Sequence, residues 1–111
     1  MAGKFDLKKS PSGKFMFNLK SGNGQIVLTS QLYDSKAAAE KGIASVRKNS
    51  SEEGRFERKV ATSGESYFVL KSGNSQVIGK SQMYKSKAAL ENGIASVKKN
   101  GADAGLADNT V

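Results

Sequence analysis

Apolar and polar residues alternate along two short stretches near the start of the chain. Residues 5–8 and 15–19 show this period of two, which is typical of half-buried β-strands, and residues 25–29 are predicted to form a third strand. Turn-forming residues separate the stretches: 10–13 contains the only proline, and 21–24 contains the Asn-Gly pair that suits tight hairpins. We therefore predict an antiparallel meander of three strands.

The period then changes to that of a helix. Ser35 is a good N-cap residue, because its hydroxyl can accept a hydrogen bond from an unpaired amide of the first turn. One stripe of the helix that follows is small and apolar, and it comprises Ala38, Ala39, Gly42, Ile43 and Val46. We expect this stripe to cover the sheet.

The same order of elements occurs twice. Aligning residues 5–49 with 56–100 needs no gap and gives 26 identities in 45 positions. Three strands and one small helix bury little apolar surface, so each copy alone would be marginally stable. We predict one domain over 1–111, made of repeats 1–51 and 52–111, and a monomer with internal pseudo-two-fold symmetry.

The amino-acid composition argues against several classes of catalytic and cofactor chemistry. The chain has no Cys and no His, which makes thiolate chemistry and zinc, haem or iron–sulfur cofactors improbable. The absence of cysteine and of a long apolar run favours a cytoplasmic protein without a membrane anchor. The net charge is +8, with +6 in residues 1–51 and +2 in 52–111. Such a surface either attracts polyanions or keeps a small protein soluble.

The repeated segments resemble the YegP-like proteins, small bacterial proteins of unknown function that occur as tandem repeats or as dimers of one repeat. Residues 19–24, 26–30, 35–38 and 42–46 carry the resemblance, and the second copy shows it at 70–74, 81–84 and 93–97. The resemblance implies an α+β fold in two layers, built from two β3-α-β units. The units would form one antiparallel sheet, exchange the strands at 55–59 and 105–108, and carry both helices on one face. It implies no activity.

The helix starts are one candidate site. A helix N-terminus attracts anions, and a lysine lies in the first turn of both copies. The alternative is that the serines cap, the tyrosines pack and the lysines are solvated. The candidate residues are Tyr33, Ser35 and Lys36, with Tyr84, Ser86 and Lys87 in the second copy.

The sheet face without helices is the second candidate. If Phe17, Leu19, Phe68 and Leu70 face the helices, the opposite face carries Met16, Asn18, Lys20, Tyr67, Val69 and Lys71, and the third strands could add Val27 and Ile78. This mixture suits a protein partner or a single-stranded nucleic acid. An ordinary half-exposed surface or self-association face is the alternative.

Two glycines inside the helices, Gly42 and Gly93, indicate close approach of a neighbouring element or, alternatively, of a ligand. No serine, lysine, tyrosine or carboxylate stands in a recognisable activating arrangement. The sequence therefore favours a non-enzymatic binding or interaction module of unknown partner. The alternative is a basic nucleic-acid-binding protein that uses the open sheet face.

Overall fold

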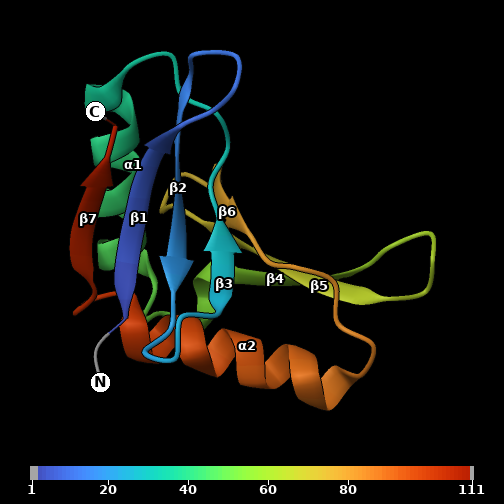
Figure 1. The fold of residues 1–111 in the computed structure, drawn as a ribbon. Coiled ribbons are helices and arrows are strands. Elements are labelled where there is room, and N and C mark those ends of the chain that lie inside the picture. The colour runs from blue at the N-terminus through green and yellow to red at the C-terminus, as the bar shows by residue number, and fades with distance from the viewer. Residues whose placement is uncertain (1–2, 111) are drawn as a thin grey trace.

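The computed structural model describes residues 3–110, which form one sheet and two α-helices (Figure 1). In chain order the elements are β1 (Lys4–Lys9), β2 (Phe15–Lys20), β3 (Ile26–Thr29), α1 (Lys36–Asn49), the 3₁₀ turn η1 (Glu53–Arg55), β4 (Phe56–Val60), β5 (Ser66–Lys71), β6 (Val77–Lys80), α2 (Lys87–Asn100) and β7 (Gly105–Asn109). The α+β class is therefore confirmed.

The seven strands are ordered β4-β5-β6-β3-β2-β1-β7. Five of the six pairings are antiparallel, and the sixth, between β1 and β7, is parallel. The expectation of a wholly antiparallel sheet is thus wrong at this edge. The two repeats meet at β3 and β6, which share the single pair Thr29↔Lys80. The sheet twists strongly, so that β4 and β5 run across the direction of β1 and β2 (Figure 1).

The strand that follows each helix joins the sheet half of the other repeat. β4 follows α1 and pairs with β5, while β7 follows α2 and pairs with β1. Two complete β3-α-β units would need eight strands, but the sheet has seven. The difference arises because β4 is both the strand after α1 and the first strand of the second repeat.

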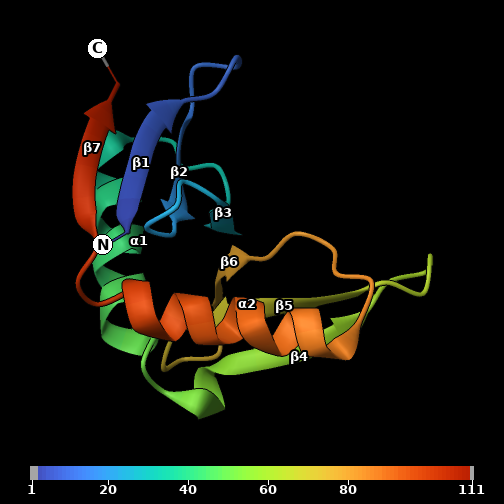
Figure 2. The same ribbon diagram turned by 60° about the horizontal axis from the view of Figure 1, so that its bottom comes forward.

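Both helices pack on the same side of the sheet and span both repeats. Helix α1 contacts β2, β5 and β6, and α2 contacts β5, β2 and β3; Figure 2 shows α2 lying along β5. Ser35 and Ser86 cap the two helices by accepting hydrogen bonds from the amides of Ala38 and Ala89, each at 3.1 Å. The serine caps expected from the sequence are therefore present.

One continuous core lies between the layers. Its largest fully buried side chains come from both repeats and include Phe5, Phe17, Phe68, Leu19 and Leu70. The phenylalanines pack edge to face within each repeat, with ring centres 5.8 Å and 5.7 Å apart, a favourable geometry for aromatic pairs.

A bulge in each third strand corrects one expectation. The pairing register shifts between Leu19 and Lys20 in the first repeat and between Leu70 and Lys71 in the second. A bulge places two successive residues opposite one partner, which breaks the strict alternation of faces. Val27 and Ile78 consequently lie in the core, 5% and 7% exposed, and not on the open face.

Equivalent positions of the two repeats touch each other where the halves meet. A Cβ at Gly79 would lie 2.7 Å from the side chain of Leu28, its counterpart in the first repeat. A Cβ at Gly101 would likewise collide with Ser50, its own counterpart. A side chain on a two-fold axis meets its symmetry mate, and this chain avoids the collision by placing glycine in the second copy.

Candidate functional site

The open face is the sheet surface that carries no helix. The strand register aligns one residue of each strand in a row across it: Glu57, Val69, Lys80, Thr29, Asn18, Asp6 and Ala107. Strand alternation places six lysines on this face, namely Lys4, Lys8, Lys20, Lys59, Lys71 and Lys80. Lys20 of β2 and Tyr67 and Lys71 of β5 therefore share the open face, as strand alternation predicted, with β3 and β6 between the two strands.

Two carboxylates interrupt this basic surface. Asp6 lies 3.3 Å from Lys20, and Glu57 lies 2.8 Å from Lys71 and 3.6 Å from Lys59. The hydrogen bond from Lys71 lowers the pKa of Glu57. Partial burial opposes ionisation of Asp6, but hydrogen bonds from Asn109 and Lys20 outweigh it and lower its pKa. Six lysines against two carboxylates leave a charge of +4, half of the chain's +8.

The apolar part of the open face is small. Tyr67 is half-buried, and the ammonium of Lys80 lies 4.8 Å from its ring centre, within the range of a cation–π interaction. Asn18 and Val69 are only 3% and 5% exposed, so neither offers much surface to a partner. Met16 stands where the second repeat has Tyr67, which leaves one aromatic ring on this face.

The helix-start residues do not form one site. The hydroxyl of Ser35 already accepts a hydrogen bond from the amide of Ala38 as the N-cap of α1. Lys36 forms an ion pair of 2.5 Å with Asp108 of β7. The hydrogen bond with Lys36 lowers the pKa of Asp108 to about 2. Tyr33 does not lie at the start of α1. Its backbone pairs with Phe15, and its ring contacts the middle of the helix at Gly42. In the second repeat, Ser86 caps α2, and Tyr84 packs on its helix in the same way.

The tyrosine ring explains the mid-helix glycine. A Cβ at Gly42 would collide with the hydroxyl of Tyr33 and lie 3.0 Å from Phe17, and Gly93 has the same relation to Tyr84 and Phe68. Tyr33 also stacks on Phe17 at 6.2 Å. Burial raises the pKa of Tyr33, which a hydrogen bond with Gln31 partly offsets. The close approach that the two glycines indicate is made by a tyrosine outside the named strands together with a phenylalanine of the sheet.

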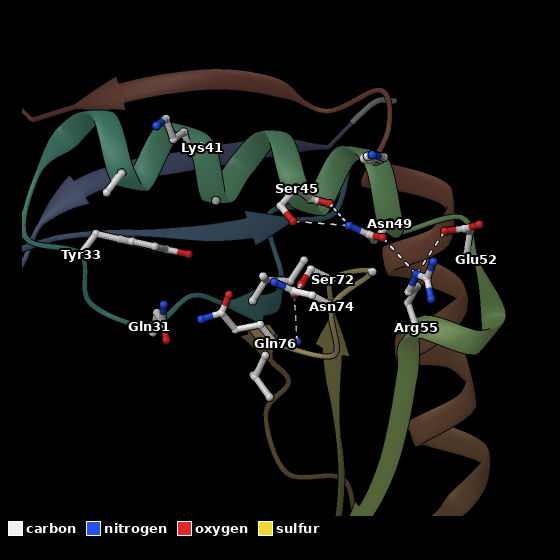
Figure 3. Close-up of a pocket in the computed structure, with 16 residues that line it drawn as sticks. Gln31, Tyr33, Lys41, Ser45, Asn49, Glu52, Arg55, Ser72, Asn74 and Gln76 are labelled. Atoms are coloured by element: carbon white, nitrogen blue, oxygen red, sulfur yellow. Dashed lines mark hydrogen bonds and ion pairs between the residues drawn. The ribbon is translucent and has the colours of Figure 1, made fainter.

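Two related grooves lie between each helix and the hairpin of the other repeat. The first groove, of about 650 Å³, runs between α1 and the β5–β6 hairpin (Figure 3). Its counterpart between α2 and the β2–β3 hairpin comprises adjoining hollows of about 640 Å³ and 230 Å³. Polar residues of the first groove are Gln31, Tyr33, Lys41, Ser45, Lys48, Asn49, Glu52, Arg55, Ser72, Asn74 and Gln76. Matching residues of the second are Tyr84, Asn92, Ser96, Lys99, Asn100, Ser21, Asn23 and Gln25.

Sequence reasoning missed these grooves because each is assembled across repeats. The hairpin loops 21–24 and 72–75 form tight turns, with Asn23 and Asn74 accepting from Ser21 and Ser72, and turn chemistry alone does not indicate a groove. The available signal was the identity of polar residues, such as Gln25 and Gln76, between the two copies. Within residues 3–110, no cluster of three acidic side chains could hold a metal ion, and neither helix is long and apolar enough to cross a bilayer.

Fold and surfaces together define a class: tandem-repeat α+β proteins whose two copies share one twisted sheet. The chain belongs to the family described as Domain of unknown function (DUF1508), whose profile matches it twice, over residues 10–57 and 61–108. The resemblance to YegP-like proteins is thereby confirmed.

Relatives share the whole length of the chain. The UPF0339 protein YegP of Shigella flexneri is 57% identical over 110 residues, covering 99% of this chain and 100% of the relative. The YegP of Escherichia coli strain K12 is 56% identical over the same coverage.

Two solution NMR structures have the same fold. The yegP structure from E. coli, titled a protein of unknown function, superposes with a TM-score of 0.94 at 56% identity, covering 99% of this chain and 95% of that one. A UPF0339 protein of Shewanella oneidensis gives 0.91 at 48% identity, covering 97% and 92%.

Proposed function

We propose that the protein is a non-enzymatic binding module whose open face binds single-stranded nucleic acid. The observation that carries this proposal is the concentration of charge: six lysines and two carboxylates share the face without helices. Lysines attract phosphates as point charges, and a neutralised phosphate releases counterions. Tyr67, beside Lys80, supplies a ring on which a base can stack.

The proposal assigns no reaction to the chain. The sequence lacks His and Cys, the commonest general base and the strongest protein nucleophile at neutral pH. The carboxylates of the open face form ion pairs with lysines. Burial raises the pKa of the half-buried Tyr33 and Tyr84, which disfavours a tyrosinate at neutral pH. Each of these features is consistent with binding.

The test is fluorescence anisotropy with labelled single-stranded DNA and RNA over a series of salt concentrations. Lys8→Ala/Lys80→Ala removes two open-face lysines that have no ion-pair partner among the described residues. For single strands the salt slope falls by about 0.7 per lost phosphate contact, so the double variant should lose about 1.4.

The matched control is Lys85→Ala/Lys87→Ala, which removes the same charge at the start of α2 on the helix side. The control should keep the wild-type slope. Absence of binding to either nucleic acid at low salt, or equal losses in the two variants, would refute the proposal.

A further inference from the structure

We propose that the two grooves between helix and opposite hairpin are a pair of equivalent nucleotide sites. Each would take a planar base beside its tyrosine, at the hairpin glutamine, and a phosphate at the last-turn lysine of the helix. The first groove uses Tyr33, Gln76 and Lys48, and the second uses Tyr84, Gln25 and Lys99. These sites lie on the helix side of the sheet and do not depend on the open face.

Identity between the copies is the first argument. Eleven of the sixteen residues that line the first groove are identical to the aligned residue of the other repeat. Several of these have structural roles: Ser72 and Asn74 form a turn, and the amide of Asn49 donates to the carbonyl of Ser45 in the last turn of α1. Gln76 and Lys48 have no such role. An exposed side chain of this kind is free to differ between copies.

The glutamine and the lysine of each groove are nevertheless the same. Gln25, Gln76, Lys48 and Lys99 are all exposed, and within residues 3–110 none of these side chains has a hydrogen-bond or ion-pair partner. On the open face Asn18 aligns with Val69 and Thr29 with Lys80, but the lysine pairs Lys8/Lys59 and Lys20/Lys71 are retained there too. Three of these four lysines, Lys20, Lys59 and Lys71, are ion-paired, whereas the side chains of the retained glutamines and lysines of the grooves have no partner among the described residues.

Charge selects an anionic ligand. The one carboxylate that lines the first groove in the described part of the chain is Glu52, which lies 3.3 Å from Arg55. The Nε of Arg55 also donates to Asn49 at 3.1 Å. Among residues 3–110, no carboxylate lines the second groove. Lys48 and Lys99 thus stand as uncompensated cations at corresponding places, and a phosphate is the anion that such a lysine commonly binds.

Hydrogen-bonding groups and shape select a base as the other part of the ligand. A glutamine side chain offers a donor and an acceptor side by side, the pattern that pairs with a base edge. Figure 3 shows Tyr33 reaching along the groove below α1, with Gln76 on the facing hairpin. Small or apolar groups, Ala38, Gly42 and Ile78, complete the lining. The groove volume of about 650 Å³ lies within the usual range of ligand pockets.

The test is a titration of the full ¹⁵N-labelled chain with AMP, GMP, CMP and UMP, followed by amide chemical shifts. We expect at least one nucleotide to shift Lys48 and Gln76 in the first groove, and Lys99 and Gln25 in the second. Ribose 5-phosphate and inorganic phosphate are the control ligands and should bind about tenfold more weakly.

The duplication supplies matched control variants. Gln76→Ala should weaken the first groove by about tenfold and leave the second within about twofold, while Gln25→Ala should do the reverse. Lys41 has Asn92 as its counterpart, so Lys41→Asn should bring the affinity of the first groove down to that of the second. Lys8 and Lys80 line neither groove, so Lys8→Ala/Lys80→Ala should leave the nucleotide-dependent shifts of Lys48, Gln76, Lys99 and Gln25 as in the wild type, which separates this inference from the proposed function.

Three outcomes would overturn the inference. Equal shifts and affinities with inorganic phosphate would reduce the grooves to anion sites without base recognition. Shifts confined to open-face residues such as Lys8 and Lys80 would place the nucleotide on the sheet. No shift in either groove up to about 10 mM nucleotide, a concentration that detects even weak complexes, would leave the grooves without this ligand.

Discussion

At the scale of single residues, two opposing effects act at Gly42: glycine lowers the helix propensity, but there is no room for a larger side chain. Alanine is the better helix former by about 1 kcal/mol, but its Cβ at this position would meet the hydroxyl of Tyr33 and lie 3.0 Å from Phe17. Overpacking of this kind costs about 1–3 kcal/mol. We therefore expect Gly42→Ala to lower the free energy of unfolding in urea titrations. Gly93→Ala should behave alike, whereas a gain in stability in either variant would contradict the packing seen at Tyr33 and Tyr84.

The same two tyrosines predict a loss of stability in alkali. Burial raises the pKa of Tyr33 and Tyr84 above 10.0 in the folded state. Unfolded chains therefore release these protons at lower pH than folded ones, and the linked stability falls as pH rises from about 10 through the folded pKa. Urea unfolding as a function of pH measures the fall, and the double variant Tyr33→Phe/Tyr84→Phe should show a shallower one. An unchanged pH dependence in that variant would exclude the tyrosines as its source.

At the scale of elements, one carboxylate holds the exposed strand β4 against α2. Glu53 accepts from Arg58 of β4 at 2.9 Å and from Lys98 of α2 at 2.5 Å, and Arg58 also pairs with Glu91 at 2.5 Å. The hydrogen bond with Arg58, followed by that with Lys98, lowers the pKa of Glu53 from 4.5 to about 2. This contribution is complete above pH 4.5 and disappears as the pH falls towards 2.

Glu53→Gln should accordingly reduce the difference in unfolding free energy between about pH 5 and pH 2. Glu65→Gln in the β4–β5 turn is the control, since that carboxylate lies near Ser63 and away from this network. Equal acid sensitivity in wild type and Glu53→Gln would show that the network adds nothing to stability.

Elements differ in how much of them the sequence could predict. Strands β1 to β3 and both helices follow from local periodicity and from the caps Ser35 and Ser86. Strand β7 does not, because its only large apolar residue is Leu106 and its parallel pairing with β1 is a tertiary contact. The bulges that turn Val27 and Ile78 inward were equally invisible, since alternation alone assigns them to the open face.

Of the two candidate surfaces, the sequence could predict the open face but not the grooves. Period two sufficed to place Lys20, Tyr67 and Lys71 on the open face, because one strand fixes the facing of its own residues. The grooves needed the fold, since each combines a helix with the hairpin of the other repeat. The sequence signal that could have indicated them is the recurrence of polar residues such as Gln25 and Gln76 in both copies.

At the scale of the whole molecule, the junction between the halves explains why the two repeats of this chain differ at two pairs of positions. Leu28 is fully buried and occupies the space that a side chain at Gly79 would need. Ser50, also fully buried, has the same relation to Gly101. Two copies with Leu28 would overfill the centre of the sheet, and two with Gly79 would leave a cavity there. The duplicated chain can hold one of each, which a symmetric pair of single repeats cannot.

Exchanging the two residues in the full chain tests this asymmetry. Gly79→Leu alone should cost about 1–3 kcal/mol or more through overpacking, and Leu28→Gly alone about 3–5 kcal/mol through the cavity and lost burial. The double variant Leu28→Gly/Gly79→Leu returns one leucine to the centre, so it should recover at least about 2 kcal/mol of the summed loss in a double-mutant cycle from urea unfolding. Strictly additive losses would mean that the two positions do not share one space, and the pseudo-two-fold junction between the repeats would then be wrong.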